Sequence, residues 1–90
     1  MILVNKETVV MMSSENIKQL ILNKLPGAEI IVKGDDGRHF EALVIDNSFE
    51  GMKQLRRQQL VYDAVGDRIK NGEIHALSLK TYSHNERLVR

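Results

Sequence analysis

Three glycine-containing breaks divide this chain of 90 residues and limit the order of elements that it can form. Leu25-Pro26-Gly27 ends a helix, because proline disfavours helical geometry for the residue before it and cannot donate into the helical hydrogen-bond ladder. Asp35-Asp36-Gly37 is typical of a hairpin turn, and Asn71-Gly72 is typical of the end of a helix. The breaks predict a helix, a pair of strands, a second helix and a third strand, in that order.

The first half of the chain predicts one helix and two strands. The helix is expected over about residues 14–25, where Ser13-Ser14-Glu15 supplies a hydroxyl N-cap and an acid in the first turn. Its apolar face is formed by Ile17, Leu20, Ile21 and Leu25. Residues 28–33 are short, apolar and β-branched, which predicts the first strand, and residues 39–46 predict the second.

The second half begins with a loop at residues 46–48, in which Ser48 can cap the next helix. We expect that helix over about residues 49–65, with a further turn that continues to residues 71–72. Its apolar face is predicted to contain Leu55, Val61, Tyr62 and Val65. Gln58 falls within this face and would require hydrogen-bond partners.

The last segments predict a strand at residues 74–82 and a short helical turn opened by a capping box at residues 83–86. A helical crossover between the second and third strands favours a parallel, right-handed connection. The expected fold is therefore α+β, a single α-β-β-α-β domain with a short helical tail. Its three-stranded mixed sheet would be covered by helices on one face.

Composition excludes several classes of protein and of site. The chain is 42% hydrophobic and 28% charged, as in an ordinary globular domain, and its net charge of +1 gives no overall bias toward nucleic acid or membranes. It contains no cysteine, so neither a disulfide nor a cysteine-only metal site can form. Any metal must be bound by histidine, by carboxylates or by the thiolates of a partner.

The N-terminal residues 1–12 are interpreted as an extension outside a core domain of residues 13–90. The extension would be disordered, packed as an extra strand, or the product of a misplaced start, with Met11 or Met12 as the alternative. No apolar run reaches the length of a signal peptide core or a membrane span, which favours a cytoplasmic protein with no membrane partner.

Three segments taken together resemble the BolA family, and in particular its short bacterial branch. They are Gly34-Asp35-Asp36-Gly37-Arg38-His39-Phe40, Arg56-Arg57-Gln58-Gln59-Leu60-Val61-Tyr62 and Asn71-Gly72-Glu73-Ile74-His75-Ala76-Leu77-Ser78-Leu79-Lys80-Thr81-Tyr82. The resemblance covers residues 13 to about 86 and implies the KH-like fold of that family. It also implies a protein that pairs with a monothiol glutaredoxin around a shared [2Fe–2S] cluster, in iron–sulfur trafficking or iron and redox sensing. The cysteine of the glutaredoxin and bound glutathione would supply the other ligands.

His75 and His39 are the candidate metal ligands. Each lies near the N-terminal end of its predicted strand, so parallel strands would bring both imidazoles to the same edge of the sheet. Imidazole binds iron, and it replaces thiolate in some [2Fe–2S] centres. The resemblance matches His75 to the usual cluster ligand of the family, whereas many members carry the second ligand inside the loop that here precedes His39. The alternative for His75 is a surface or hydrogen-bonded residue, and the alternative for His39 is a structural role; His84 is expected to be exposed.

Lys53, Arg56 and Arg57 form a basic start to the second long helix. This start predicts a contact with glutaredoxin, a plain solvated face, or, as the alternative function, a DNA-binding regulator of the BolA type. Many family members carry Arg-His-Arg where this chain has Arg57-Gln58-Gln59, a departure that disfavours DNA binding. Residues 34–37 spell the G-x-x-G loop of KH domains, but their two aspartates would repel phosphate, so we predict a simple turn.

The sequence contains no cysteine nucleophile, G-x-S-x-G, P-loop or H-E-x-x-H motif. We therefore expect no enzymatic activity. Two histidines are too few to hold a cluster tightly, so the isolated chain is not expected to bind one. A homodimer in which a sheet edge pairs with itself is a third possibility.

Overall fold

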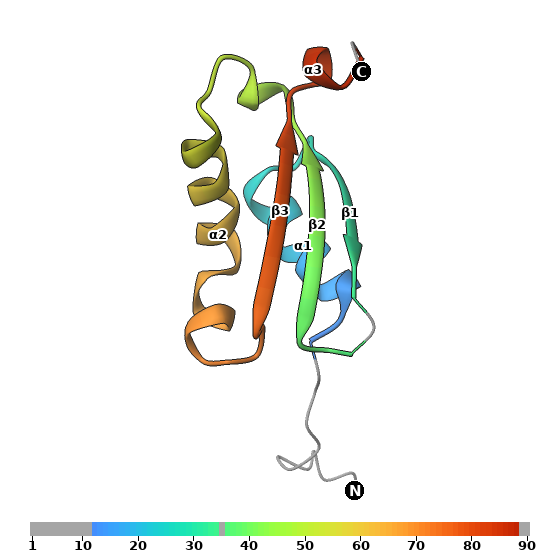
Figure 1. The fold of residues 1–90 in the computed structure, drawn as a ribbon, viewed down its shortest axis with the longest axis vertical. Helices are drawn as coiled ribbons and strands as arrows, with labels where there is room; N and C mark the ends of the chain where they lie inside the picture. The colour runs from blue at the N-terminus through green and yellow to red at the C-terminus, as the bar shows by residue number, and fades with distance from the viewer. Residues whose placement is uncertain (1–11, 35, 89–90) are drawn as a thin grey trace, which may run out of the picture.

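The computed structural model describes residues 12–34 and 36–88 of the chain (Figure 1). The elements follow in the order α1 (Ser14–Lys24), β1 (Glu29–Lys33), β2 (His39–Ile45), the 3-10 turn η1 (Asn47–Phe49), α2 (Gln54–Lys70), β3 (Ala76–Tyr82) and α3 (His84–Leu88). The predicted order of helices and strands is confirmed. The expected α+β class with a three-stranded mixed sheet is confirmed as well.

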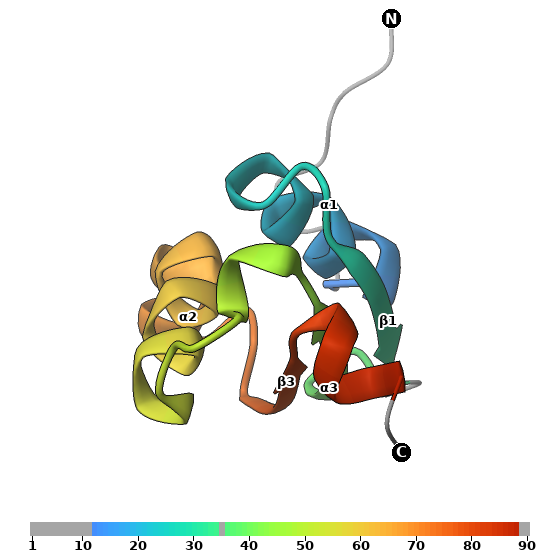
Figure 2. The same ribbon diagram turned by 90° about the horizontal axis from the view of Figure 1, so that it is seen from above.

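The sheet has the strand order β1-β2-β3. β1 and β2 are antiparallel, with Glu29 opposite Ile45, and β2 and β3 are parallel, with His39 opposite Ala76. α1 and α2 pack on one face of the sheet and against each other, as Figures 1 and 2 show. The parallel pair starts both of its strands at the same end of the molecule, which matters for the candidate site.

The core lies between this face and the two long helices. Strand alternation turns every second side chain of β2 inward, namely Phe40, Ala42 and Val44. The helices contribute Ile17, Ile21, Val61 and Val65, all of them at most 1% exposed. Met12 is also buried in this cluster, so the core begins one residue earlier than predicted. The rest of the expected N-terminal extension, residues 1–11, lies outside the described residues.

α2 departs from the prediction at its start. It begins at Gln54 rather than near Phe49, because Phe49 is fully buried in η1 and Gly51, with a φ of +75°, turns the chain before the helix. Asp46, not Ser48, caps this turn, and its carboxylate accepts hydrogen bonds from the backbone N–H and the hydroxyl of Ser48. The helix then runs without interruption to Lys70.

The expected buried face of α2 was also partly wrong. Leu55 is 69% exposed, whereas Arg57, Val61 and Val65 are buried, so the inward stripe is shifted from the predicted one. Gln58, which was expected to need partners, is only half-buried. The buried polar side chain of this helix is Arg57.

α3 confirms the predicted capping box at its start. The backbone N–H of Ser83 donates to the Glu86 carboxylate at 2.8 Å, and the N–H of Glu86 donates to Ser83 Oγ at 3.1 Å. Within residues 12–34 and 36–88, no helix is long and apolar enough to span a bilayer.

Candidate functional site

The backbone pairing of β2 with β3 brings His39 and His75 together. His39 is the first residue of β2, and the backbone N–H groups of His75 and Ala76 both donate to the carbonyl oxygen of Arg38, at 2.9 and 3.1 Å. The two imidazole rings have their centroids 5.0 Å apart and are inclined at 73°. The expectation that both rings lie at the same edge of the sheet is confirmed.

Asp36 fixes the His39 ring. Its carboxylate accepts hydrogen bonds from the backbone N–H groups of Arg38 and His39, both at 2.8 Å, and lies 2.7 Å from His39 Nδ1. These hydrogen bonds hold the pKa of the Asp36 carboxyl well below its usual range. The bond from the backbone N–H of His39 has the largest effect, followed by the bond from the N–H of Arg38 and that from the His39 ring. Because an ionised carboxylate only accepts hydrogen bonds, Nδ1 carries the proton and the neutral ring keeps its lone pair on Nε2. A metal-binding histidine commonly has this carboxylate partner on its other nitrogen.

Sequence reasoning did not identify Asp36. The signal was present, since an aspartate that opens a tight turn readily accepts hydrogen bonds from backbone groups two or three residues on. The spacing Asp36-Gly37-Arg38-His39 places the ring of His39 within reach of the same carboxylate.

His75 is exposed, and among residues 12–34 and 36–88 its ring contacts the His39 ring but accepts no hydrogen bond. Its nitrogens are therefore available to a ligand. Two imidazoles bound to one tetrahedral metal at about 2.1 Å place their ring centroids about 5 Å apart, which the separation of this pair matches. In its separation the pair matches two histidines that bind one iron, as in a Rieske-type [2Fe–2S] centre.

The pair cannot complete a metal site alone. Within the part of the chain that the structure describes, no group of three or more histidine, aspartate or glutamate side chains is arranged to hold a metal ion. The remaining ligands would have to come from outside the described residues.

The basic start of α2 is not part of this site. Arg57 hydrogen-bonds to the carbonyl oxygen of Thr81, near the end of β3, whereas His75 precedes that strand. Six residues of strand separate the two positions, which corresponds to about 20 Å. Lys53 and Arg56 are exposed and lie at the start of α2. That start and the start of β3 lie at opposite ends of the molecule (Figure 1).

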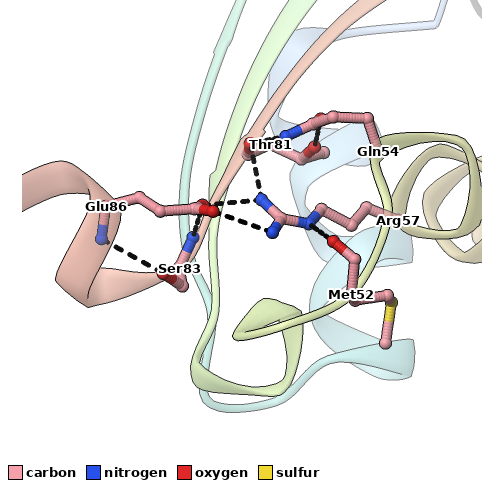
Figure 3. Close-up of polar contacts among 6 residues, drawn as sticks. All are labelled: Met52, Gln54, Arg57, Thr81, Ser83 and Glu86. Carbon is pink, nitrogen blue, oxygen red and sulfur yellow. Dashed lines mark hydrogen bonds and ion pairs between the residues drawn. The ribbon is translucent and has the colours of Figure 1, made fainter.

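Arg57 itself corrects the prediction of a basic binding surface, because it is only 3% exposed. Its Nε donates to the Met52 carbonyl at 2.7 Å, and its Nη1 and Nη2 donate to the Glu86 carboxylate at 2.6 and 2.9 Å (Figure 3). The two hydrogen bonds to Glu86 are the largest cause that raises the pKa of Arg57, and they are also the largest cause that lowers the pKa of Glu86 to about 2. Arg57 therefore ties α2 to β3 and α3 and is not available to a partner.

The other predicted surface features have structural partners. His84 is 36% exposed and lies 2.7 Å from Asn47 Oδ1 and 2.8 Å from Glu29 Oε2 through its two ring nitrogens. The G-x-x-G segment joins β1 to β2, as predicted. Gly34 has no room for a side chain, since an added Cβ would lie 2.6 Å from the His39 carbonyl oxygen.

Fold and site together define a small KH-like α+β protein with a surface pair of imidazoles. Residues 10–86 match the family described as BolA-like protein, and the chain belongs to the BolA family. It is 35% identical over 75 residues to the acid stress protein IbaG of Escherichia coli K12, which covers 83% of this chain and 88% of that protein.

Solved structures agree with this assignment. A BolA protein homologue from Coxiella burnetii is 44% identical, with a TM-score of 0.76 over 87% of this chain and 99% of that one. The BolA domain of SufE1 from Arabidopsis thaliana is 26% identical, with a TM-score of 0.71 over 81% of this chain and 93% of that domain.

Proposed function

We propose that this protein is a non-enzymatic adaptor that pairs with a monothiol glutaredoxin and shares with it a glutathione-bridged [2Fe–2S] cluster. The observation that carries the proposal is the pair of imidazoles 5.0 Å apart at an exposed edge of the sheet. The chain has no cysteine, so the thiolate ligands must come from the partner and from glutathione. The SufE-like protein 1 of Arabidopsis thaliana matches this chain over only 12% of its own length, and a BolA domain of SufE1 has been solved, which is in keeping with a module that works beside other proteins.

In this proposal His75 and His39 would bind one iron, and Asp36 would keep His39 in the tautomer that presents Nε2. The cluster supplies one-electron redox chemistry when bound. Neutral imidazoles in place of thiolates raise the reduction potential of such a centre. The contribution of the chain is therefore two neutral donors at a fixed separation and a surface against which the partner packs.

The test is anaerobic mixing of the protein with a cluster-loaded monothiol glutaredoxin and glutathione, followed by visible absorption, circular dichroism and sedimentation. A changed spectrum and a heterodimer are expected for the wild type, and both should be lost in His75→Ala. His84→Ala is the matched control, because it also removes an imidazole but at the other end of β3. If the wild type gives neither a complex nor a spectral change, the adaptor proposal is wrong.

DNA binding through the start of α2 is the second candidate, and the exposure of Lys53 and Arg56 is the observation in its favour. With Arg57 held internally, these two cations would neutralise about two phosphates, which predicts a slope of about −1.8 in a plot of log K against log salt. A much steeper slope in a duplex titration would place the contact elsewhere.

Pairing of sheet edges between two copies is the third candidate. At the β3 edge the outward carbonyls of Leu77 and Thr81 already accept hydrogen bonds, from the Tyr62 hydroxyl and from the side chains of Arg57 and Gln54. A homodimer of this kind would therefore use β1. Sedimentation that shows only monomer in the presence of cluster and glutathione would exclude it.

A further inference from the structure

One face of the sheet has no covering helix in the part of the chain that the structure describes. α1 and α2 lie on the opposite face (Figure 2), and α3 follows β3 at the far end of the sheet (Figure 1). The uncovered side carries a shallow depression of about 400 Å³. We call this surface the open face and define it by Ile31, Lys33, Glu41, Leu43, Lys80 and Arg87.

The floor of the open face is apolar. Ile31 is 55% exposed although it lies within β1, and Leu43 of β2 is half-buried beside it, since it pairs with Ile31 in the strand register. Large aliphatic side chains that share one exposed sheet surface favour contact with another apolar surface.

The rim of the open face is basic. Lys33, Lys80 and Arg87 surround the floor together with a single carboxylate, that of Glu41, although the whole chain has a net charge of only +1. Within residues 12–34 and 36–88, neither lysine lies within 4.0 Å of a carboxylate oxygen. The surface therefore carries a net charge of +2 around an apolar centre, with Glu41 opposite Lys33 in the strand register.

The open face is continuous with the histidine pair. His39, Glu41 and Leu43 alternate with the buried residues of β2, so their side chains project from the same side of the sheet. Leu43 lies four residues beyond His39, which corresponds to about 13 Å along the strand. A stable interface covers about 800 Å² on each partner, a patch that extends about 15 Å from its centre.

We propose that the open face is the docking surface for the thiol-bearing partner that completes the cluster. That partner would present carboxylates to Lys33, Lys80 and Arg87 and an apolar side chain to Ile31 and Leu43. This inference rests on the proposed function. It places the partner on the sheet and not on the basic start of α2, because the open face begins beside the histidine pair. Glu41 lies two residues beyond His39 on β2 and pairs with Lys33, whereas the whole start of α2 is about 20 Å from His75.

Two other occupants fit less well. A second copy of this chain would bring three cations against three cations, and like charges in contact disfavour association. Single-stranded nucleic acid is bound by several stacked aromatic rings, whereas this depression has one, that of Tyr82.

The experiment measures the Kd between cluster-loaded monothiol glutaredoxin and variants of the full chain, by isothermal titration calorimetry under anaerobic conditions. Lys80→Glu and Ile31→Thr change the rim and the floor, and the second keeps a β-branched residue in the strand. Lys80→Glu is expected to weaken binding about tenfold or more, and to make the Kd depend less on salt than in the wild type, because it lowers the net charge of the rim from +2 to zero. Ile31→Thr should weaken binding about threefold to tenfold. At saturating partner both complexes should keep the wild-type visible circular dichroism, because the ligands remain.

Lys24→Glu, an exposed charge reversal on α1, is the matched control and should leave the Kd unchanged. Lys53→Glu makes the same change at the start of α2.

A loss of affinity for Lys53→Glu, with none for Lys80→Glu, would move the contact to α2 and overturn the proposal. Retention of affinity in Lys80→Glu and Ile31→Thr, while His75→Ala loses the complex, would refute this docking surface and leave the proposed function standing. A wild type that forms no complex would refute both. If Lys80→Glu abolishes binding of an oligo(dT) strand and leaves the heterodimer intact, the open face binds nucleic acid and the proposal is wrong.

Discussion

Replacement of Arg57 by methionine should destabilise the fold strongly, although Arg57 is a charged residue in a helix with an exposed side. The guanidinium donates to the carbonyl oxygens of Met52 and Thr81 and to the Glu86 carboxylate. Methionine occupies part of the volume but donates no hydrogen bond. Thr81 retains a donor in Gln54 Nε2 at 3.4 Å, and Glu86 is 40% exposed and can be rehydrated, so the main loss is at the Met52 carbonyl.

A buried acceptor that loses a charged donor costs about 1.5–3 kcal/mol, and the weakened Thr81 contact adds to this. We therefore expect Arg57→Met to lower the free energy of unfolding by about 2–3 kcal/mol. In a domain of this size that corresponds to a fall in Tm of roughly 10–20 °C. Urea unfolding followed by far-ultraviolet circular dichroism measures the change, with Arg56→Met as control, because the neighbouring arginine is exposed and its replacement should stay within about 0.5 kcal/mol of wild type. Equal stability of the two variants would refute the conclusion that the Arg57 contacts stabilise the packing of α2 against β3 and α3.

Four further substitutions test other features of the structure. The pKa of Glu86 is about 2 in the folded protein against an ordinary 4.5, so ionised Glu86 stabilises the fold fully above pH 4.5 and this stabilisation is lost as the pH falls toward 2. Glu86→Gln should therefore lose less Tm than the wild type across that pH range. An unchanged pH dependence of Tm would contradict the role of Glu86. Asp36→Ala removes the acceptor that fixes His39, so the ¹⁵N chemical shifts of that ring should change from a single Nε2-unprotonated tautomer to a mixture. A spectrum that stays the same would show that Asp36 has no such role. Gly34→Ala should lower the free energy of unfolding by about 1–3 kcal/mol, because its Cβ would lie 2.6 Å from a backbone oxygen. Gly66→Ala, with nothing within 4 Å of the new Cβ in a helix, should instead raise it by about 0.5–1 kcal/mol, as thermal melts of the two variants would show.

The order of elements could be predicted because its signals are local. A proline-glycine stop, a turn rich in aspartate and glycine, and an asparagine-glycine helix end each act on a few neighbouring residues. The start of α2 was misplaced because Phe49 has the spacing of a helical apolar residue, while the turn that buries it depends on Asp46 and on the positive φ of Gly51. Only packing against the core distinguishes a buried turn from the first turn of a helix.

Arg57 shows where pattern reasoning could have gone further and where it could not. It lies four and eight residues before Val61 and Val65, so helical spacing places it on the buried stripe, and this could have been recognised in the sequence. Its partner could not, because Glu86 is 29 residues away and reaches Arg57 only through the position of α3. A charge on a buried stripe is a reason to expect an ion pair, but tertiary structure decides with which residue.

The candidate site was predictable to the extent that topology controls it. Two strands joined by a helical crossover are parallel, and parallel strands begin at the same end, which was enough to bring His39 and His75 together. At the opposite end of β3, the guanidinium of Arg57 forms an internal ion pair with Glu86, and both ring nitrogens of His84 have hydrogen-bond partners. The two imidazoles at the start of β2 and β3 differ from this, because one is oriented by a carboxylate and the other accepts no hydrogen bond from any described residue. The Arg57 contacts and the two imidazoles are thus separated by the length of β3. Residues at the histidine end can therefore be changed to test binding without disturbing the Arg57 contacts.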